Sequence, residues 1–256
     1  MRKKHIDASL NSEAAPKPLW DETIRTMLYA IGLALVFRSL LFEPFHIPSG
    51  SMKDTLLVGD YIFVSKYAYG YSRYSFPLGL PLFEGRIGAD SRPQRGDVAV
   101  FRLPSNAKVD YIKRVIGLPG DTVQMRAGRL YLNGALVEHT PLPHFEDQVN
   151  GQVTEHIRRY KELLPNGVSH HILDTSSDGW LDNTPLFVVP EGHYFMMGDN
   201  RDNSMDSRTL QVGFIAEEYL IGRAEMVFFS IDERTSIWKI WDWWWAMRSD
   251  RLLQSI

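Results

Sequence analysis

The sequence of 256 residues contains no cysteine. This absence excludes disulfide bonds, a thiol nucleophile and zinc sites built on thiolate ligands. The formal net charge is only −3, so the chain lacks the basic face that binding to phosphates requires, and we expect no nucleic-acid partner. Because 44% of the residues are hydrophobic, the chain can form a core, and its length fits one domain or one domain with a large insertion.

Several enzyme motifs are absent as well. The chain has no His-Glu-x-x-His, no Gly-x-Ser-x-Gly, no phosphate-binding loop and no Gly-x-Gly-x-x-Gly. The acidic segment 199–206 is similar to a calcium-binding loop, but Arg201 and Ser204 stand where a ligand and the turn glycine belong. We therefore expect neither a metal ion nor another cofactor.

The N-terminal part predicts a membrane anchor. Residues 1–21 are polar, whereas 22–43 are mostly apolar, and a helix over the apolar span 24–42 would be about 28 Å long, close to the roughly 30 Å of a bilayer's hydrocarbon core. Arg25 and Arg38 lie near the ends of this stretch, where long side chains can reach the head groups. We predict a transmembrane helix over 22–43 after a tail over 1–21; a buried or interfacial helix would have the same spacing.

The residues that flank the anchor predict that it is not cleaved off, and they predict its orientation in the membrane. No small-x-small cleavage pattern follows Phe37, which argues against a segment that is removed. Basic residues gather on the N-terminal side, at Arg2, Lys3, Lys4, Lys17 and Arg25. The positive-inside rule then predicts a single-pass protein whose N-terminus is cytoplasmic and whose remaining chain, after residue 42, lies outside.

The rest of the chain predicts a mostly β, antiparallel body. Segments with strand patterns are 61–64, 97–101, 109–116, 129–137, 186–189, 194–197 and 224–231. Asn133-Gly134 marks the tip of one hairpin. We assign the body to 44–137 and 186–236, and we predict that 138–185, richer in polar residues, histidine and proline, form a β-rich insertion or cap.

The C-terminal segment 237–256 is rich in tryptophan and holds five of the seven in the chain. Helical spacing is found for Ile237, Ile240, Trp241, Trp244 and Trp245. Such a helix could contact lipid at the membrane–water boundary or pack on its own domain, and the sequence favours neither.

Three segments could carry chemistry. In the segment 48–52, two serines flank a glycine, which lets backbone N–H groups approach a substrate carbonyl. Strand alternation in 110–116 makes Lys113 the one charged residue of an apolar face, with Arg114 on the other face. Burial would lower the pKa of this lysine, and a neutral amine could deprotonate a serine hydroxyl; an exposed Lys113 is the alternative.

The third segment, 198–208, is a polar loop between two apolar runs. Asp206 and Arg208 are close enough in sequence to pair and hold the loop rigid. A rigid polar loop beside a buried lysine could orient it, whereas an ordinary turn with many Asp and Asn residues would have the same composition.

These segments resemble the conserved boxes of bacterial type I signal peptidases, the membrane-bound Ser/Lys endopeptidases that remove signal peptides from exported proteins. The resemblance lies in Pro48-Ser-Gly-Ser-Met52, Gly96-Asp-Val98, Tyr111-Ile-Lys-Arg-Val-Ile-Gly-Leu-Pro-Gly-Asp121 and Gly198–Arg208. It covers most of the chain apart from the insertion and the tryptophan-rich segment.

The resemblance implies a role for each matching residue. Ser51 would be the nucleophile, and Lys113 the general base. Ser49 would donate to the oxyanion together with the backbone N–H of Ser51, and Ser204 would orient the lysine amine. Asp206 and Arg208 would form a supporting ion pair, with Asp199 and Arg201 bracing the same loop. The positions that match the family's substrate pockets are Phe45, Ile47, Met52, Leu56, Ile62, Tyr111 and Ile112.

The family also implies an activity and a location. We expect cleavage after an Ala-x-Ala-like site through an acyl-enzyme, without a cofactor, with preprotein signal peptides, membrane lipid and the nearby export machinery as partners. The expected place is the bacterial inner membrane, with the catalytic body on the periplasmic side. Two alternatives stay open: a protease that matures conjugative pilin, and a non-catalytic, membrane-tethered domain that binds exported chains. A self-cleaving repressor with a similar Ser/Lys pair fits less well, because it would have a DNA-binding domain and no membrane span.

Overall fold

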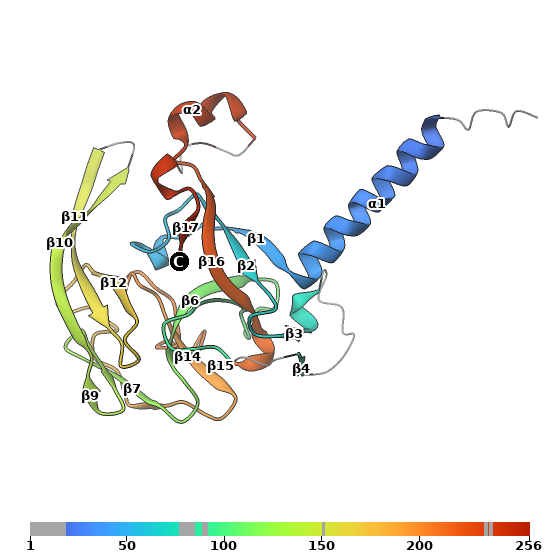
Figure 1. Cartoon of the computed structure of the whole chain (residues 1–256). Coiled ribbons are helices and arrows are strands. Elements are labelled where there is room, and N and C mark those ends of the chain that lie inside the picture. Colours follow the sequence, from blue (N-terminus) through green and yellow to red (C-terminus); the bar gives the residue numbers. More distant parts are fainter. Residues whose placement is uncertain (1–18, 77–84, 89–91, 150–151, 233–234, 236–237) are drawn as a thin grey trace, which may run out of the picture. The chain divides into compact units, whose positions relative to one another are not determined.

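The computed structural model describes residues 19–76, 85–88, 92–149, 152–232, 235 and 238–256 (Figure 1). The chain divides into two compact units, residues 1–37 and 38–256. Most of the predicted tail 1–21 lies outside the described residues.

Helix α1 (Leu19–Leu40) accounts for the described part of the first unit. Among the described residues, its portion Glu22–Leu40 is the one helix long and apolar enough to cross a membrane. The helix ends before the predicted boundary at 43, and strand β1 begins at Phe42. Pro44 disfavours helical backbone at Glu43, and the pairing of Phe42–His46 with β2 requires an extended chain from Phe42 onward.

The second unit is built around a curled antiparallel sheet of eight strands. The strands follow the order β1-β2-β16-β5-β6-β14-β15, and β17 pairs with β16 beyond the end of β5. Their bounds are β1 (Phe42–His46), β2 (Asp60–Ser65), β5 (Val98–Arg102), β6 (Asp110–Gly117), β14 (His193–Met197), β15 (Ile215–Ala216), β16 (Leu220–Ser230) and β17 (Gln254–Ser255). Irregularities in the pairing of β16 with β2 and β5 increase the local twist and curl the sheet.

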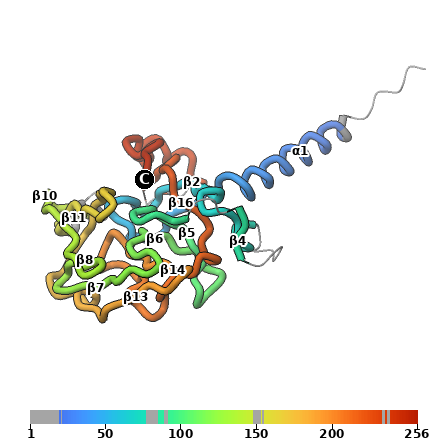
Figure 2. Tube along the Cα trace, turned by 60° about the horizontal axis from the view of Figure 1, so that its bottom comes forward, coloured from blue at the N-terminus to red at the C-terminus, as the bar shows by residue number. Residues whose placement is uncertain are grey.

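Two smaller sheets flank this one, and a pair of short strands completes the unit (Figure 2). The four-stranded sheet contains β13 (Phe187–Val188), β7 (Thr122–Arg126), β8 (Arg129–Leu132) and β9 (Ala135–Leu136), and the two-stranded sheet contains β3 (Tyr71–Ser72) and β4 (Arg86–Ile87). Asn133 and Gly134, both with positive φ, form the predicted turn between β8 and β9.

The predicted insertion forms a sheet of its own, which we call the insertion sheet: β10 (Glu138–Val149), β11 (Gln152–Leu163) and β12 (Ser169–Asp174). β10 is an edge strand of twelve residues, and Pro141 and Pro143 lie within it. No helix or strand is assigned to 175–185.

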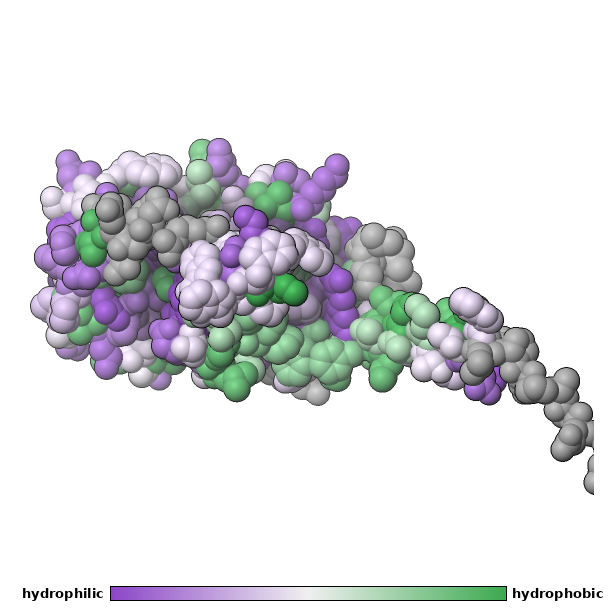
Figure 3. Space-filling model, turned by 90° about the horizontal axis from the view of Figure 1, so that it is seen from above, coloured by the Kyte–Doolittle hydropathy of each residue, from purple (hydrophilic) through white to green (hydrophobic). Residues whose placement is uncertain are grey.

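The C-terminal segment departs from the predicted helix. Its α-helix, α2 (Trp243–Ala246), has only four residues, flanked by the 3-10 turns η5 (Ile240–Asp242) and η6 (Ser249–Arg251). Ile237 lies outside the described residues. Trp243 packs against Phe229, whereas Trp238 and Trp244 are each 85% exposed. Figure 3, which views the molecule from the side of α2, shows pale aromatic and green apolar side chains gathered on this face.

Each of the seven predicted strand segments overlaps an observed strand, and the prediction of a mostly β, antiparallel body is confirmed. The core of the main sheet contains side chains from β2, β5 and β16, including Val64, Val100 and Ala224. Beside this core, the 3-10 turn η1 (Gly50–Met52), which follows β1, is in contact with β6.

Candidate active site

Ser51 lies in η1, the turn between β1 and β2. Hydrogen bonds from Ile47 N to Asp60 O (2.9 Å) and from Gly59 N to Ile47 O (3.0 Å) close the loop that carries this turn. Ser51 is 9% exposed, and its carbonyl accepts a hydrogen bond from the backbone N–H of Asn200 (3.1 Å). The serine hydroxyl is therefore held on a short, anchored turn rather than on a free loop.

Lys113 approaches Ser51 from the middle of β6. Its side chain comes from the face that strand alternation predicts, and only 3% of the residue is exposed. Nζ donates to Ser51 Oγ at 2.7 Å and to the carbonyl oxygen of Ile112 at 2.8 Å. This hydrogen bond places the amine where it can take the hydroxyl proton.

Burial lowers the pKa of Lys113 to about 8, from the ordinary value of 10.5. The carboxylates of Asp206 and Asp199 favour the charged amine and partly oppose this effect, while Arg208 adds to it. The amine therefore loses its proton at a much lower pH than an exposed lysine does.

Arg114, the next residue of β6, is buried on the opposite face. Its guanidinium forms a two-pronged pair with Asp199, with 2.9 Å from Nε to Oδ1 and 2.7 Å from Nη2 to Oδ2. Burial alone would raise the pKa of Asp199, but Arg114 more than offsets this, so the pKa of this carboxyl is lowered. The sequence predicted Asp199 as a brace and missed its partner.

The polar loop 198–208 is rigid and largely buried. Asp206 and Arg208 form the expected ion pair, with both oxygens of Asp206 at 2.8 Å from nitrogens of Arg208. Gly198 N donates to Asp206 (3.0 Å), and Arg208 donates to the carbonyl of Arg201 (2.6 Å). Burial would raise the pKa of Asp206, but the adjacent Arg208 outweighs it and lowers this pKa.

Arg201 is braced from outside its loop. Its guanidinium pairs with Glu162 on β11, and the two side chains are 4% and 2% exposed. Burial would raise the pKa of Glu162, yet Arg201 and the neighbouring His170 more than compensate and lower it. Glu162 was not among the predicted residues, because its segment lies outside the boxes that carried the resemblance.

The two remaining serines, Ser49 and Ser204, were expected to donate to the oxyanion and to orient the lysine amine. Ser49 is exposed, and its hydroxyl is 3.5 Å from Ser51 Oγ. Ser204 is 5% exposed, and in the described part of the chain no hydrogen bond joins its hydroxyl to Lys113; the hydroxyl instead helps to lower the pKa of Asp206. The expected orienting bond is not formed in this structure, in which Lys113 donates to Ser51 and Ile112.

Gly198 shows how tightly these parts meet. A Cβ at this position would lie 2.2 Å from Ser204 Oγ and 2.6 Å from the carbonyl oxygen of Ser51. Real Cβ atoms do not approach so closely, so only glycine lets the polar loop contact the serine turn.

The predicted pocket residues lie beneath and beside the pair. Ile47, Met52, Leu56 and Ile62 are at most 2% exposed and belong to one core cluster. Phe45 and Ile112 pack on that cluster, while Tyr111 packs on the neighbouring one. These large side chains leave little depth for a bound side chain.

Two strands near the pair leave an edge without a partner strand. β1 pairs only with β2, and β14 pairs with β6 from Arg114 onward, so the described strands leave free the outer edge of β1 and one edge of β6 at 110–113. Between them lies a cavity of about 490 Å³, whose lining includes Glu43, Phe45 and Asp110. Two free strand edges that face a cavity can accept an extended peptide.

The described residues include no group of three His, Asp or Glu side chains placed to hold a metal ion.

Comparison with known families decides the membership of the chain. A family model described as "Signal peptidase, peptidase S26" matches residues 20–229. The chain belongs to this signal peptidase family. Its members are serine peptidases that cleave signal peptides, and the chain shares this activity.

Individual relatives agree with this membership. The chain is 42% identical over 236 residues to the signal peptidase I of Rickettsia canadensis, covering 88% of this chain and 84% of that protein. It is 44% identical over 212 residues to the signal peptidase I of Rickettsia typhi, covering 79% and 77%. A crystal structure of a signal peptidase I from Enterococcus faecalis is 28% identical, covers 52% of this chain and 97% of that chain, and has a TM-score of 0.31.

Proposed function

We propose that the chain cleaves preproteins after an Ala-x-Ala-like site, with Ser51 as nucleophile and neutral Lys113 as general base. One observation carries this proposal: the buried Lys113 amine lies 2.7 Å from the Ser51 hydroxyl. A base must lie within hydrogen-bond reach of the proton that it removes, and its pKa must be near the working pH.

The reaction has two halves. Lys113 takes the proton of Ser51 while Oγ attacks the scissile carbonyl, and the resulting oxyanion receives hydrogen bonds from the Ser49 hydroxyl and the Ser51 N–H, each worth about 3 kcal/mol. The protonated amine then gives its proton to the leaving amine, and the C–N bond breaks to form an acyl-enzyme. In the second half, Lys113 deprotonates a water that attacks the ester and releases the signal peptide.

The substrate backbone lies in the cleft between β1 and β6. An extended peptide between two free strand edges gains main-chain hydrogen bonds on both sides, and its alternate side chains point toward the sheet. Phe45 and Ile221 line this cavity, and the core cluster behind them includes Ile47; such bulky side chains leave room for small residues, which supports selection of alanine at positions −1 and −3.

The membrane holds the enzyme near its substrate. In this proposal α1 spans the bacterial inner membrane with its N-terminus in the cytoplasm, and the β body lies on the periplasmic side near the export machinery. Exposed Trp238, Trp241 and Trp244 contact lipid, which is where tryptophan concentrates at a membrane surface. Ser51 follows the last residue of α1, Leu40, by only eleven positions, which supports cleavage close to the bilayer.

The test uses the full chain in detergent and a preprotein with an Ala-x-Ala site. We expect Ser51→Ala and Lys113→Ala to abolish cleavage while thermal unfolding stays unchanged. Ser177→Ala and Lys161→Ala serve as matched controls, because both residues are exposed and far along the chain from Ser51 and Lys113. Near-normal cleavage by the Ser51 variant would refute the proposal. If the wild-type chain binds the preprotein but does not cleave it, the result would favour a non-catalytic domain.

A further inference from the structure

The turn that carries Ser51 is bonded to the insertion sheet through two consecutive residues. Lys53 donates from Nζ to both carboxylate oxygens of Asp147 on β10, at 2.7 and 2.8 Å. Asp54 pairs with Arg159 on β11 at 2.6 Å and with His171 on β12 at 3.0 Å. Every strand of the insertion sheet therefore contributes one side chain to this contact.

A second connection runs through the main chain. Leu173 of β12 pairs through its N–H and its carbonyl with the residues on either side of Asn200, at 2.9 Å each. Asn200 in turn donates its backbone N–H to the Ser51 carbonyl and its side-chain amide to the Gly50 carbonyl, both at 3.1 Å. The insertion sheet thus holds the serine turn from two directions.

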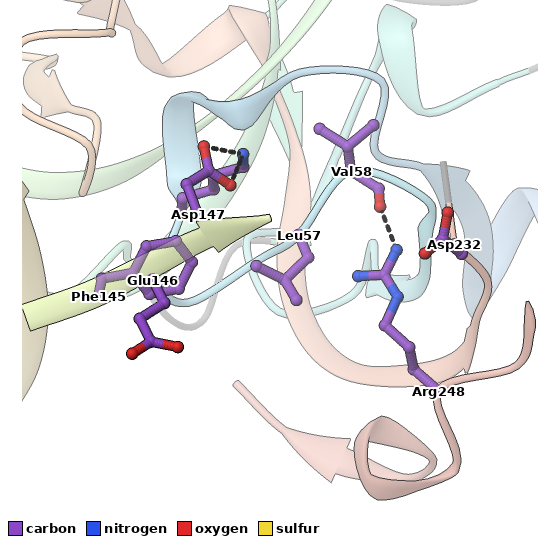
Figure 4. Close-up of a pocket in the computed structure, with 8 residues that line it drawn as sticks. Leu57, Val58, Phe145, Glu146, Asp147, Asp232 and Arg248 are labelled. Carbon is purple, nitrogen blue, oxygen red and sulfur yellow. Dashed lines mark hydrogen bonds and ion pairs between the residues drawn. The ribbon is translucent and has the colours of Figure 1, made fainter. Parts of the chain in front are cut away.

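The stem of Lys53 also packs against the turn itself. A Cβ on Gly50 would lie 3.2 Å from Cε and 3.3 Å from Cδ of Lys53, so the stem covers the residue before the nucleophile. Beyond the ion pair, a cavity of about 240 Å³ separates Phe145 and Glu146 on β10 from Leu57 (Figure 4). Because the end of β10 is not packed tightly there, the charged contact carries much of the coupling.

We propose that the insertion sheet positions the nucleophile, and that Lys53 and Asp54 are positioning residues through which it acts. This inference rests on the proposed role of Ser51. Neither residue touches the reacting atoms; the two opposite charges fix the turn between the sheet on one side and the polar loop on the other.

The expected signature is a loss of rate without a comparable loss of stability. Lys53 and Asp147 are 17% and 23% exposed at their side chains, so water screens part of their attraction, and we expect the loss of this pair to cost less stability than the loss of a fully buried pair. Misplacement of a nucleophile by about 1 Å, in contrast, can lower a rate about 100-fold. If these residues acted only in folding, their replacement would lower the stability more than the rate.

The experiment measures kcat and KM for preprotein cleavage by the full chain in detergent. We expect Lys53→Met and Asp147→Asn each to lower kcat about 10-fold, with KM changed less than about twofold. Lys161→Met is the matched control: it makes the same substitution on an exposed lysine of β11, and it should leave both constants unchanged.

A charge exchange keeps the test decisive if a single variant folds poorly. The double variant Lys53→Asp with Asp147→Lys restores an ion pair in reverse, and we expect it to recover most of the lost kcat. The pH dependence of the singles should keep the wild-type apparent pKa, since the contact acts on Ser51 and not on Lys113.

Two outcomes would overturn the inference. One is wild-type kcat in both single variants; the other is a loss that appears only as lower thermal stability and that the charge exchange does not reverse. Ser51→Ala in the same series separates the two levels: if it still cleaves, the proposed function fails, and if it is inactive while the Lys53 and Asp147 variants are normal, only the positioning role fails.

Discussion

At the scale of single residues, two adjacent basic side chains of β6 are both buried, but only one of them has a carboxylate partner. Lys113 has no carboxylate in direct contact among the described residues, and burial lowers its pKa to about 8. Arg114 pairs with Asp199, and a guanidinium stays charged in proteins. One strand thus provides a neutral base on one face and a fixed positive charge on the other.

The first prediction concerns pH. Only the neutral amine can accept the serine proton, and its fraction rises as the pH rises through the pKa of Lys113, which burial lowers to about 8. We therefore expect kcat/KM to fall on the acidic side of about pH 8 and to level off above it. Cleavage that increases only above about pH 10, where an exposed lysine titrates, would contradict a buried base.

The second prediction concerns Arg114. Arg114→Met would leave the carboxylate of Asp199, only 1% exposed, without its cation. Removing one partner of a buried pair costs about 3–5 kcal/mol, so we expect a loss of this size in the free energy of unfolding, measured with urea. The double variant with Asp199→Asn should recover part of it. A change below about 1 kcal/mol would show that the pair is not needed for folding.

Sequence patterns indicated Ser51 and Lys113, which the structure brings within hydrogen-bond distance, but not the residues that surround them. Ser51 and Lys113 stand in short motifs, and alternation placed Lys113 on an apolar face. Alternation assigned Arg114 to the opposite face without showing that this face is buried too. Glu162 lies far from the boxes in sequence, and no local pattern indicates that it meets Arg201.

At the scale of elements, the tryptophan-rich segment shows where periodicity misleads. Its spacing predicted a helix, yet α2 contains only four residues. Packing of Trp243 on Phe229 and the turns on both sides leave the other rings facing outward instead of along one helical stripe. Tertiary contacts of one ring thus outweigh a helical pattern of short length.

The third prediction tests contact of this segment with lipid. In vesicles that contain brominated lipid, we expect strong quenching of tryptophan fluorescence. Replacing Trp238, Trp241 and Trp244 with phenylalanine should remove a large part of it, because these exposed rings are the proposed contact. Replacing Trp180, which is 67% exposed in another part of the body, is the control. Equal quenching before and after the triple change would argue against the contact.

At the scale of the whole molecule, three buried carboxylates stabilise the body. Glu162, Asp199 and Asp206 are each at most 2% exposed, and each has a lowered pKa because the adjacent arginine outweighs the effect of burial. Glu162 connects β11 to the polar loop, Asp199 connects the loop to β6, and Asp206 pairs within the loop, so the body and the insertion sheet should unfold together.

The fourth prediction follows from these carboxylates. Their pKa values are lower in the folded than in the unfolded chain, so the unfolded chain binds more protons on acidification. Their stabilising contribution is complete above the ordinary values of 3.8 and 4.5 and is lost as the pH falls below them. We expect the urea midpoint to decrease steeply below about pH 4.5. A midpoint that stays constant down to pH 3 would contradict this linkage.

Strand positions along the chain were predictable, and their order in space was not. The alternating and apolar runs indicated β2, β5, β6, β14 and β16, but β16 lies between β2 and β5 although it comes last in the sequence. Pairings across more than a hundred residues depend on the fit of whole faces, which a local pattern does not contain. For the same reason, the first two residues of β1, Phe42 and Glu43, were assigned to the end of the anchor.

The prolines of β10 have a consequence for the behaviour of the molecule at high concentration. A bare margin of twelve residues would ordinarily recruit the same margin of another copy and start a fibre. Pro141 and Pro143 have no backbone N–H, so this strand offers fewer hydrogen-bond donors to a strand of a second copy. The ribbon can therefore be long enough to reach the serine turn without making the enzyme prone to polymerise.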